Sequence, residues 1–141
     1  MICSLAADGA GEPVKSPQED VSFLKTVWDY VGRWFPNPVE PGLRKIGAPD
    51  SHSPVCVTSN FHLTVRRVEK ALSDSDAWLL VAPTNGINVW CAASGGDMTA
   101  DRIIAALKTS RIAERVTHRK LILPQLSAPG VDVELLNAQS G

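Results

Sequence analysis

Short apolar runs alternate with helix-like patterns through the second half of the chain. The runs at residues 55–58, 77–82 and 121–123 have the length and composition of buried strands. Between them, apolar residues recur at helical spacing, which predicts amphipathic helices. Asn60 and Thr99 precede two of these helices and are expected to cap them. The order strand, helix, strand, helix, strand predicts a Rossmann-like α/β fold, in which helices flank a mainly parallel sheet.

A turn and a short helix follow the second predicted strand. Asn85-Gly86 predicts the turn, because Asn and Gly tolerate positive φ at low cost. Asn88 can cap a helix of about two turns that ends at Gly95-Gly96 and carries Cys91 in its first turn. The unpaired N–H groups of a helix start favour a thiolate, the form of cysteine that acts as nucleophile or metal ligand. The other interpretation is that Cys91, which has apolar neighbours, is a small buried hydrophobe.

The first part of the chain has a different character. Residues 1–20 are expected to form a flexible lead, and residues 21–53 an N-terminal helix followed by a Pro-rich connection. The helix carries an apolar stripe formed by Phe23, Leu24, Val27, Trp28, Val31, Trp34 and Phe35. Prolines and glycines predict no regular structure between residues 36 and 54. Residues 54–141 are expected to form the α/β domain, with a further short strand at 131–136 and a C-terminal truncation.

Composition excludes several classes of protein. The chain has 141 residues, is 44% hydrophobic and carries a net charge of −1, so it can bury one core but has no general attraction for nucleic acid or anionic membranes. Its cysteines, at positions 3, 56 and 91, are widely spaced and include no C-x-x-C pair, unlike a disulfide scaffold, a zinc site or an iron–sulfur site. No segment has the ~20 apolar residues of a membrane span, and the N-terminus does not resemble a signal peptide. A cytoplasmic location is expected.

Polar segments follow each predicted strand. They are Thr58-Ser59-Asn60, residues 84–91 and Gln125-Leu126. Parallel strands end at the same edge of a sheet, and open α/β sheets bind ligands beyond this edge. The three segments therefore predict one binding site.

The segment Asn88-Val89-Trp90-Cys91-Ala92-Ala93 resembles the cap-helix signature of the corrinoid protein of microbial mercury methylation. Segments at 39–43, 53–58 and 121–126 resemble parts of the same family in the same order, so that the resemblance covers about residues 39 to 133. A more distant resemblance is to the corrinoid iron–sulfur protein of acetyl-CoA synthesis. That protein shares a Val-Thr-x-Asn-Phe-like segment but lacks the cap-helix cysteine.

The resemblance implies a corrinoid (cobalamin) cofactor, with Cys91 as catalytic residue and lower axial ligand of cobalt. It implies methyl transfer from cobalt to Hg(II). The soft thiolate would tune the metal electronically. The corrinoid pattern Asp-x-His-x-x-Gly is absent, so no histidine is expected to bind cobalt. The expected cofactor-binding residues are Thr58, Ser59, Asn60, Asn88, Val89, Trp90, Cys91, Ala92, Ala93, Gln125 and Leu126.

The same resemblance implies two partners. One is a ferredoxin-like protein with two [4Fe–4S] clusters, which would reduce cobalt, and the other is a methyl-donating methyltransferase. The family also carries a C-terminal membrane domain, and no such domain is expected within these 141 residues. A further departure is Ser94-Gly95-Gly96, because the family signature continues through Gly to Lys.

Two alternatives remain. One is a methyl carrier like the corrinoid iron–sulfur protein of acetyl-CoA synthesis. The other is a nonenzymatic α/β interaction or ligand-binding domain, in which Cys91 belongs to the core.

Overall fold

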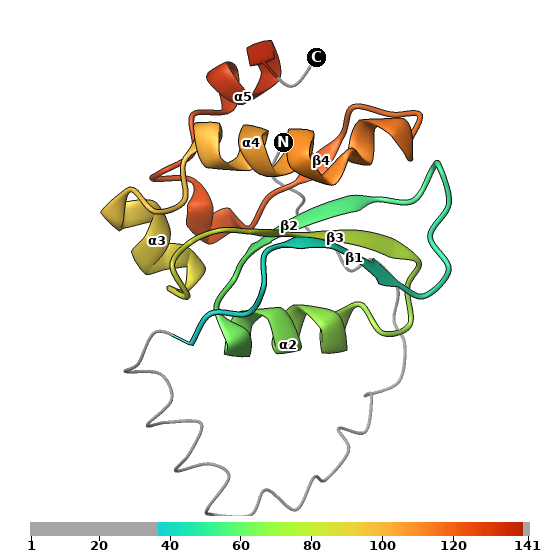
Figure 1. The fold of residues 1–141 in the computed structure, drawn as a ribbon, viewed down its shortest axis with the longest axis horizontal. Coiled ribbons are helices and arrows are strands. Elements are labelled where there is room, and N and C mark those ends of the chain that lie inside the picture. The colour runs from blue at the N-terminus through green and yellow to red at the C-terminus, as the bar shows by residue number, and fades with distance from the viewer. Residues whose placement is uncertain (1–36, 140–141) are drawn as a thin grey trace, which may run out of the picture.

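The computed structural model describes residues 37–139, which form a sheet with helices on both faces (Figure 1). The strands are β1 (Gly42–Ile46), β2 (Val55–Ser59), β3 (Ala77–Ala82) and β4 (Leu121–Ile122). The α-helices are α2 (His62–Ala71), α3 (Val89–Gly95), α4 (Ala100–Ser110) and α5 (Val133–Gln139). Two 3₁₀ turns, η1 (Ile112–Glu114) and η2 (Gln125–Ser127), flank β4 in the sequence.

The sheet has the strand order β1-β3-β2-β4. β2 pairs in parallel with β3 on one side and with β4 on the other, which confirms the three parallel strands predicted from the apolar runs. All six residues of β3 are buried, as expected of a central strand covered on both faces. The chain therefore has the Rossmann-like α/β architecture that the sequence predicts.

β1 corrects the prediction for residues 36–54. This strand lies antiparallel to β3 at the edge of the sheet, with Gly42 opposite Val81 and Ile46 opposite Ala77. The prediction of no regular structure is wrong here because prolines flank the strand without entering it. Edge strands also tolerate polar residues, which hides their pattern.

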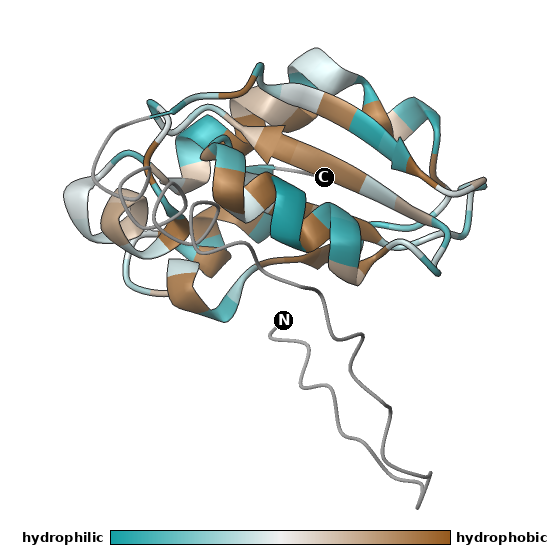
Figure 2. Ribbon diagram, turned by 90° about the horizontal axis from the view of Figure 1, so that it is seen from below, coloured by the Kyte–Doolittle hydropathy of each residue, from teal (hydrophilic) through white to brown (hydrophobic). Residues whose placement is uncertain are grey.

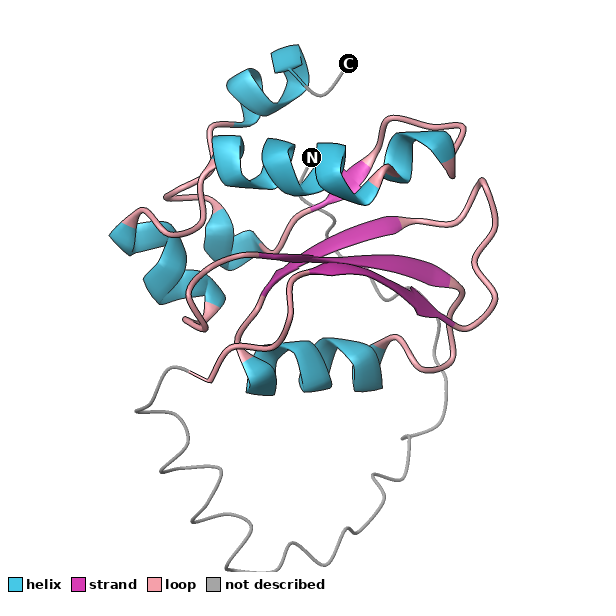
Figure 3. Ribbon diagram, viewed as in Figure 1, coloured by secondary structure: helices cyan, strands magenta, loops and turns pink. Residues whose placement is uncertain are grey.

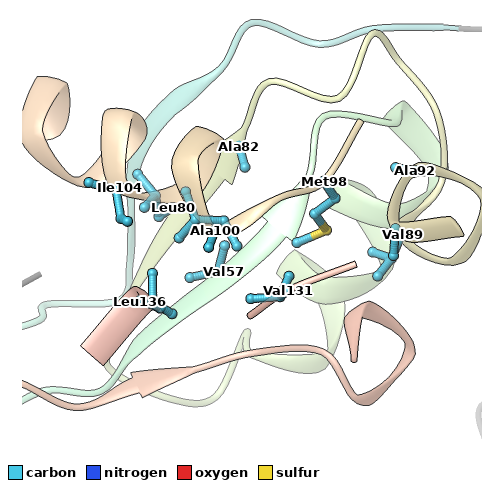
Figure 4. Packing of buried hydrophobic residues seen from close by; sticks show 12 residues of the cluster. Val57, Leu80, Ala82, Val89, Ala92, Met98, Ala100, Ile104, Val131 and Leu136 are labelled. Atoms are coloured by element: carbon cyan, nitrogen blue, oxygen red, sulfur yellow. The ribbon is translucent and has the colours of Figure 1, made fainter. Parts of the chain in front are cut away.

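The two faces of the sheet are covered differently. α2 covers one face, where Val65 packs with Leu79 and Val81, while α4 and α5 lie on the other (Figures 1 and 3). Figure 2 shows α2 with both hydrophobic and hydrophilic residues, as expected of a helix with one buried side. The larger core lies on the α4 side and joins β2, β3, α3, α4 and α5 (Figure 4).

The C-terminal segment also differs from its prediction. Residues 133–139 form helix α5, where a short strand was expected from residue 131. Asp132 begins this helix, because its Oδ1 accepts a hydrogen bond from the N–H of Leu135 at 3.0 Å. Val131 and Leu136 are buried in the core, so the apolar residues of this segment are used by a helix.

The predicted flexible lead and N-terminal helix fall outside the described residues. Within residues 37–139, no helix combines the length and the apolarity that crossing a membrane would require.

Candidate functional site

α3 lies beside the edge of the sheet at which β2 and β3 end (Figure 1). Ser59 and Ala82, the last residues of these strands, are paired in register, so both strands end at the same level. α3 contacts β2 and the 3₁₀ turn η2, which follows β4. The three segments that the sequence placed at this edge are therefore brought together.

Asn88 fixes the start of α3 and also contacts Cys91. Its Oδ1 accepts a hydrogen bond from the backbone N–H of Cys91 at 3.0 Å, and its Nδ2 donates to Cys91 Sγ at 3.4 Å. Gly96 ends the helix in the left-handed conformation with φ 79°. The predicted short helix, with Asn88 as its N-cap and Cys91 in its first turn, is confirmed. The amide of Asn88 holds both the backbone and the sulfur of Cys91.

One side of α3 is packed into the protein. Val89, Ala92 and Ala93 are buried in the larger core together with Met98 (Figure 4). Gly130, which follows η2, lies against the backbone of Ala93. These residues seat the helix, and their side chains are turned away from solvent.

The other side of α3 is open. Cys91 is exposed, and Trp90 is 57% exposed although it is a large apolar side chain. In η2, Gln125 is exposed and Leu126 is 60% exposed. Cys91 is thus not part of the core, which removes one interpretation left open by the sequence. The exposed surface of α3 and η2 combines apolar area, a thiol and an amide.

Two buried hydroxyl groups lie at the end of β2. Thr58 Oγ1 and Ser59 Oγ are inaccessible to solvent and have no hydrogen-bond partner in the structure. A buried polar group without a partner costs free energy, about 1–3 kcal/mol. Successive strand residues face opposite sides of the sheet, so the two hydroxyls lie beneath different faces at the end of β2.

Asn60 is placed differently from the expectation. It does not cap α2, whose N-cap is Phe61 and which has no side-chain cap. Its Oδ1 instead accepts hydrogen bonds from the N–H groups of Thr84 and Gly86, at 3.0 and 2.9 Å. The side chain therefore turns from its own helix to the connection between β3 and α3.

The connection after α3 is tied to the same turn. Asp97 Oδ1 accepts a hydrogen bond from Asn85 Nδ2 at 2.8 Å and lies 3.5 Å from Arg102 Nη2. Arg102 Nη1 also donates to the carbonyl oxygen of Pro83 at 3.3 Å. Sequence reasoning missed Asp97, Arg102 and Gly130, because their contacts join segments that no local pattern relates.

Other candidate ligands lie elsewhere. His118 is a loop residue: its Nδ1 accepts from the N–H of Lys120 at 3.2 Å, so its Nε2 donates to the carbonyl oxygen of Ser53 at 3.0 Å. Cys56 is half-buried in β2 and packs against the cluster under α2. In the part of the chain that the structure describes, no three His, Cys, Asp or Glu side chains gather as a metal site.

Comparison with known proteins relates this chain to subunits of one enzyme complex. Residues 29–133 match the family described as CO dehydrogenase/acetyl-CoA synthase delta subunit. The chain is 42% identical over 95 residues to the acetyl-CoA decarbonylase/synthase complex subunit gamma of Methanopyrus kandleri, covering 66% of this chain and 21% of that protein. It is 42% identical over 113 residues to subunit gamma 2 of the same complex from Methanosarcina thermophila, covering 77% of this chain and 24% of that protein. The chain thus spans less than a quarter of the length of these relatives.

Proposed function

We propose that this chain, which belongs to the CO dehydrogenase/acetyl-CoA synthase delta subunit family, is the corrinoid-binding domain of a methyl carrier. The carrier would be related to the corrinoid iron–sulfur protein of acetyl-CoA synthesis. The observation that carries the proposal is the position of α3, which presents Trp90 and Cys91 at the carboxyl edge of a parallel sheet, in contact with η2. Because the chain spans less than a quarter of the length of these relatives, the activity of the whole carrier is included in this proposal.

The residues at this edge fit a corrinoid. The ring of such a cofactor is wide and flat, with amide groups around its rim, so it needs apolar area and scattered hydrogen-bonding groups. Trp90 and Leu126 supply exposed apolar area, and Gln125 supplies an exposed amide. The unpartnered hydroxyls of Thr58 and Ser59 lie at the same end of the sheet, but they are inaccessible to solvent, so they stay expected cofactor-binding residues without an assigned contact.

The expected cofactor-binding residues of α3, its N-cap and η2 differ in exposure. Trp90, Cys91, Gln125 and Leu126 are exposed, and we assign direct contact with the ring to them. Val89, Ala92 and Ala93 are buried and would act by keeping α3 in place. Asn88 would support Cys91 through the two hydrogen bonds that join them.

When bound, the corrinoid supplies a cobalt centre that accepts and releases a methyl group. Cys91 would hold the cobalt through its sulfur, a role for which a thiolate is suitable because it is soft and electron-rich. Asn88 Nδ2 holds the sulfur in place by its hydrogen bond. No residue of this chain is assigned as acid or base. Electrons and methyl groups would come from the two partners expected from the sequence, a ferredoxin-like protein with [4Fe–4S] clusters and a methyltransferase.

Methyl transfer to Hg(II) becomes the second candidate. The sequence favoured this activity, but the matched family and relatives are named for acetyl-CoA metabolism. The observation in favour of mercury is the exposed Cys91. It lies in the first turn of α3, which Asn88 caps, within a segment that resembles the mercury-methylation signature. Against it stands Ser94-Gly95-Gly96, where that signature has Gly followed by Lys.

The test is a binding experiment with cobalamin. The full chain, supplied with reduced cobalamin, should bind it and become coloured, with the cofactor's own base displaced from cobalt. Cys91→Ala should change the visible spectrum of the bound corrinoid, whereas Cys56→Ala, on β2 under α2, should not. Failure of the wild-type chain to bind cobalamin would favour a nonenzymatic α/β domain. Incubating the methyl-loaded protein with Hg(II) and measuring methylmercury decides the second candidate.

A further inference from the structure

Asn60 is almost fully buried, at 4% exposure, and every bond of its side chain leads away from α2. Besides accepting from the N–H groups of Thr84 and Gly86, its Oδ1 lies 2.9 Å from Thr84 Oγ1. Its Nδ2 donates to the carbonyl oxygen of Val39 at 3.1 Å. One amide therefore joins the end of β2 to the segment before β1 and to the turn after β3.

The contact between Asn60 and Thr84 is reciprocal. The backbone N–H of Asn60 donates to Thr84 Oγ1 at 3.2 Å, while the backbone N–H of Thr84 donates to Asn60 Oδ1. The Thr84 hydroxyl has a single proton, which can go either to Asn60 Oδ1 or to the carbonyl oxygen of Ile87, 3.1 Å away. Thr84 is buried, so these partners replace water completely.

The turn that Asn60 holds is conformationally demanding. Asn85 and Gly86 both have positive φ, at 55° and 71°, and the N–H of Ile87 donates to the carbonyl oxygen of Thr84 at 3.0 Å. This is a tight turn with two left-handed central residues. Gly86 is buried, and its N–H would lack a partner without Asn60. Asn88 follows only two residues later, so the turn sets the position of the first residues of α3.

We propose that Asn60 is a positioning residue for Cys91. It holds the turn at residues 84–87 so that Asn88 and Cys91 are presented at the edge of the sheet. The importance of this role for cofactor binding rests on the proposed function. The effect on the turn itself does not, because it can be measured without any corrinoid.

The test compares Asn60→Leu with Asn60→Asp in the full chain. Leu removes the acceptor at similar size, whereas Asp retains it, loses the donation to Val39 and places a buried carboxyl oxygen against the carbonyl oxygen of Val39. In Asn60→Leu, hydrogen exchange at the Gly86 amide should accelerate about tenfold or more, as expected when a buried N–H loses its acceptor. Affinity for cobalamin should fall by a similar factor. In Asn60→Asp, the melting temperature should fall because a carboxyl group is buried, but both quantities should stay closer to wild type than in Asn60→Leu because the acceptor for Gly86 remains.

Val65→Ala is the matched control for general destabilisation. Val65 is buried under α2, on the face of the sheet away from the larger core. This variant should lower the melting temperature while Gly86 exchange under native conditions and cobalamin affinity change little. Equal losses of affinity in Val65→Ala and Asn60→Leu would overturn the proposal. If Asn60→Leu does not fold, Thr84→Val, which removes only the hydroxyl, should still accelerate Gly86 exchange.

The outcomes separate the two proposals. Unchanged Gly86 exchange in Asn60→Leu and Thr84→Val would overturn the positioning role, whatever the cofactor result. A wild-type chain that does not bind cobalamin would overturn the proposed function. In that case, accelerated exchange in Asn60→Leu would still establish that Asn60 holds the turn.

Discussion

Gly130 lies directly against Ala93, so close that a Cβ added to Gly130 would come within 2.7 Å of Ala93 Cα. The nearby atoms belong to the backbone of α3, which cannot move aside as a flexible side chain can. This contact joins the segment after η2 to the helix that carries Cys91. The absence of a side chain at Gly130 is thus a condition for the observed position of α3.

Gly130→Ala should therefore destabilise the protein. We expect a loss of about 1–3 kcal/mol in the free energy of unfolding, because α3 or the segment after η2 must shift. Gly95→Ala is the control, since a Cβ there would meet only Asp97 Oδ2, at 3.9 Å. That change lies within a helix and should leave stability equal or raise it. Urea unfolding of the two variants measures the difference.

A second pair of glycines separates backbone strain from contact. Gly86 and Gly96 both have positive φ, but a Cβ on Gly86 would come 2.7 Å from Pro38 N, while nothing lies within 4 Å of one on Gly96. Gly96→Ala should cost about 1–2 kcal/mol, from the left-handed conformation alone. Gly86→Ala should cost clearly more in the same unfolding measurement. Equal costs would mean that Pro38 yields without penalty.

Asp50 should make stability depend on pH. Hydrogen bonds from the backbone N–H of His52 and from the hydroxyl of Ser53 to its carboxylate hold the pKa of Asp50 below its ordinary value of 3.8. A lowered pKa in the folded state stabilises the fold above that value, and the contribution is lost as the pH falls through the folded pKa. The urea midpoint should therefore fall as the pH is lowered from about 5 towards about 2. Asp50→Asn should show a smaller fall over the same range.

Removing the unpartnered hydroxyls of Thr58 and Ser59 should not destabilise the protein. Thr58→Val and Ser59→Ala remove buried groups that have no hydrogen bond, so stability should stay equal or rise. Ser127→Ala is the contrast, because its buried hydroxyl donates to the carbonyl oxygen of Pro124 at 2.7 Å. It should cost about 1 kcal/mol.

The affinity for cobalamin is a second quantity to measure on the same variants. If these hydroxyls serve the corrinoid, the Thr58 and Ser59 variants should bind it more weakly although they are at least as stable as wild type. Unchanged affinity in both would remove them from the proposed site.

Local patterns predicted the elements whose partners are close in the sequence. The apolar run 77–82 gives β3, and Asn88 with Gly96 gives α3, because caps and buried runs follow from nearby residues alone. Asn60 shows where this reasoning ends. Its type suits a helix cap, yet its side chain bonds a turn 24 residues away, and only the pairing of β2 with β3 brings them together. The exposure of Trp90 likewise depends on which side of α3 meets the core.

The predictions for the segments that form β1 and α5 were wrong for different reasons. In β1, the half-buried Leu43 and Ile46 are not an even number of residues apart, so the alternation typical of a strand is missing. In the segment that forms α5, the apolar residues Val131, Val133 and Leu135 alternate with polar ones and so resembled a strand, although Asp132 was a usable helix-start signal. β1 is recognised only by its pairing with β3, whereas the start of α5 is indicated by Asp132 itself.

The antiparallel direction of β1 decides where a change in chain length would act. Gly42 pairs with Val81, near the end of β3, so the residues before β1 lie at the edge where the parallel strands finish. There Val39 donates to the carbonyl oxygen of Asn60 at 2.9 Å, and Pro38 lies against Gly86. An insertion in front of a parallel strand would be absorbed at the opposite edge, but here it would press on the turn that leads to Cys91. The number of residues between Pro38 and Gly42 is thus constrained by a turn that the chain reaches only after β3.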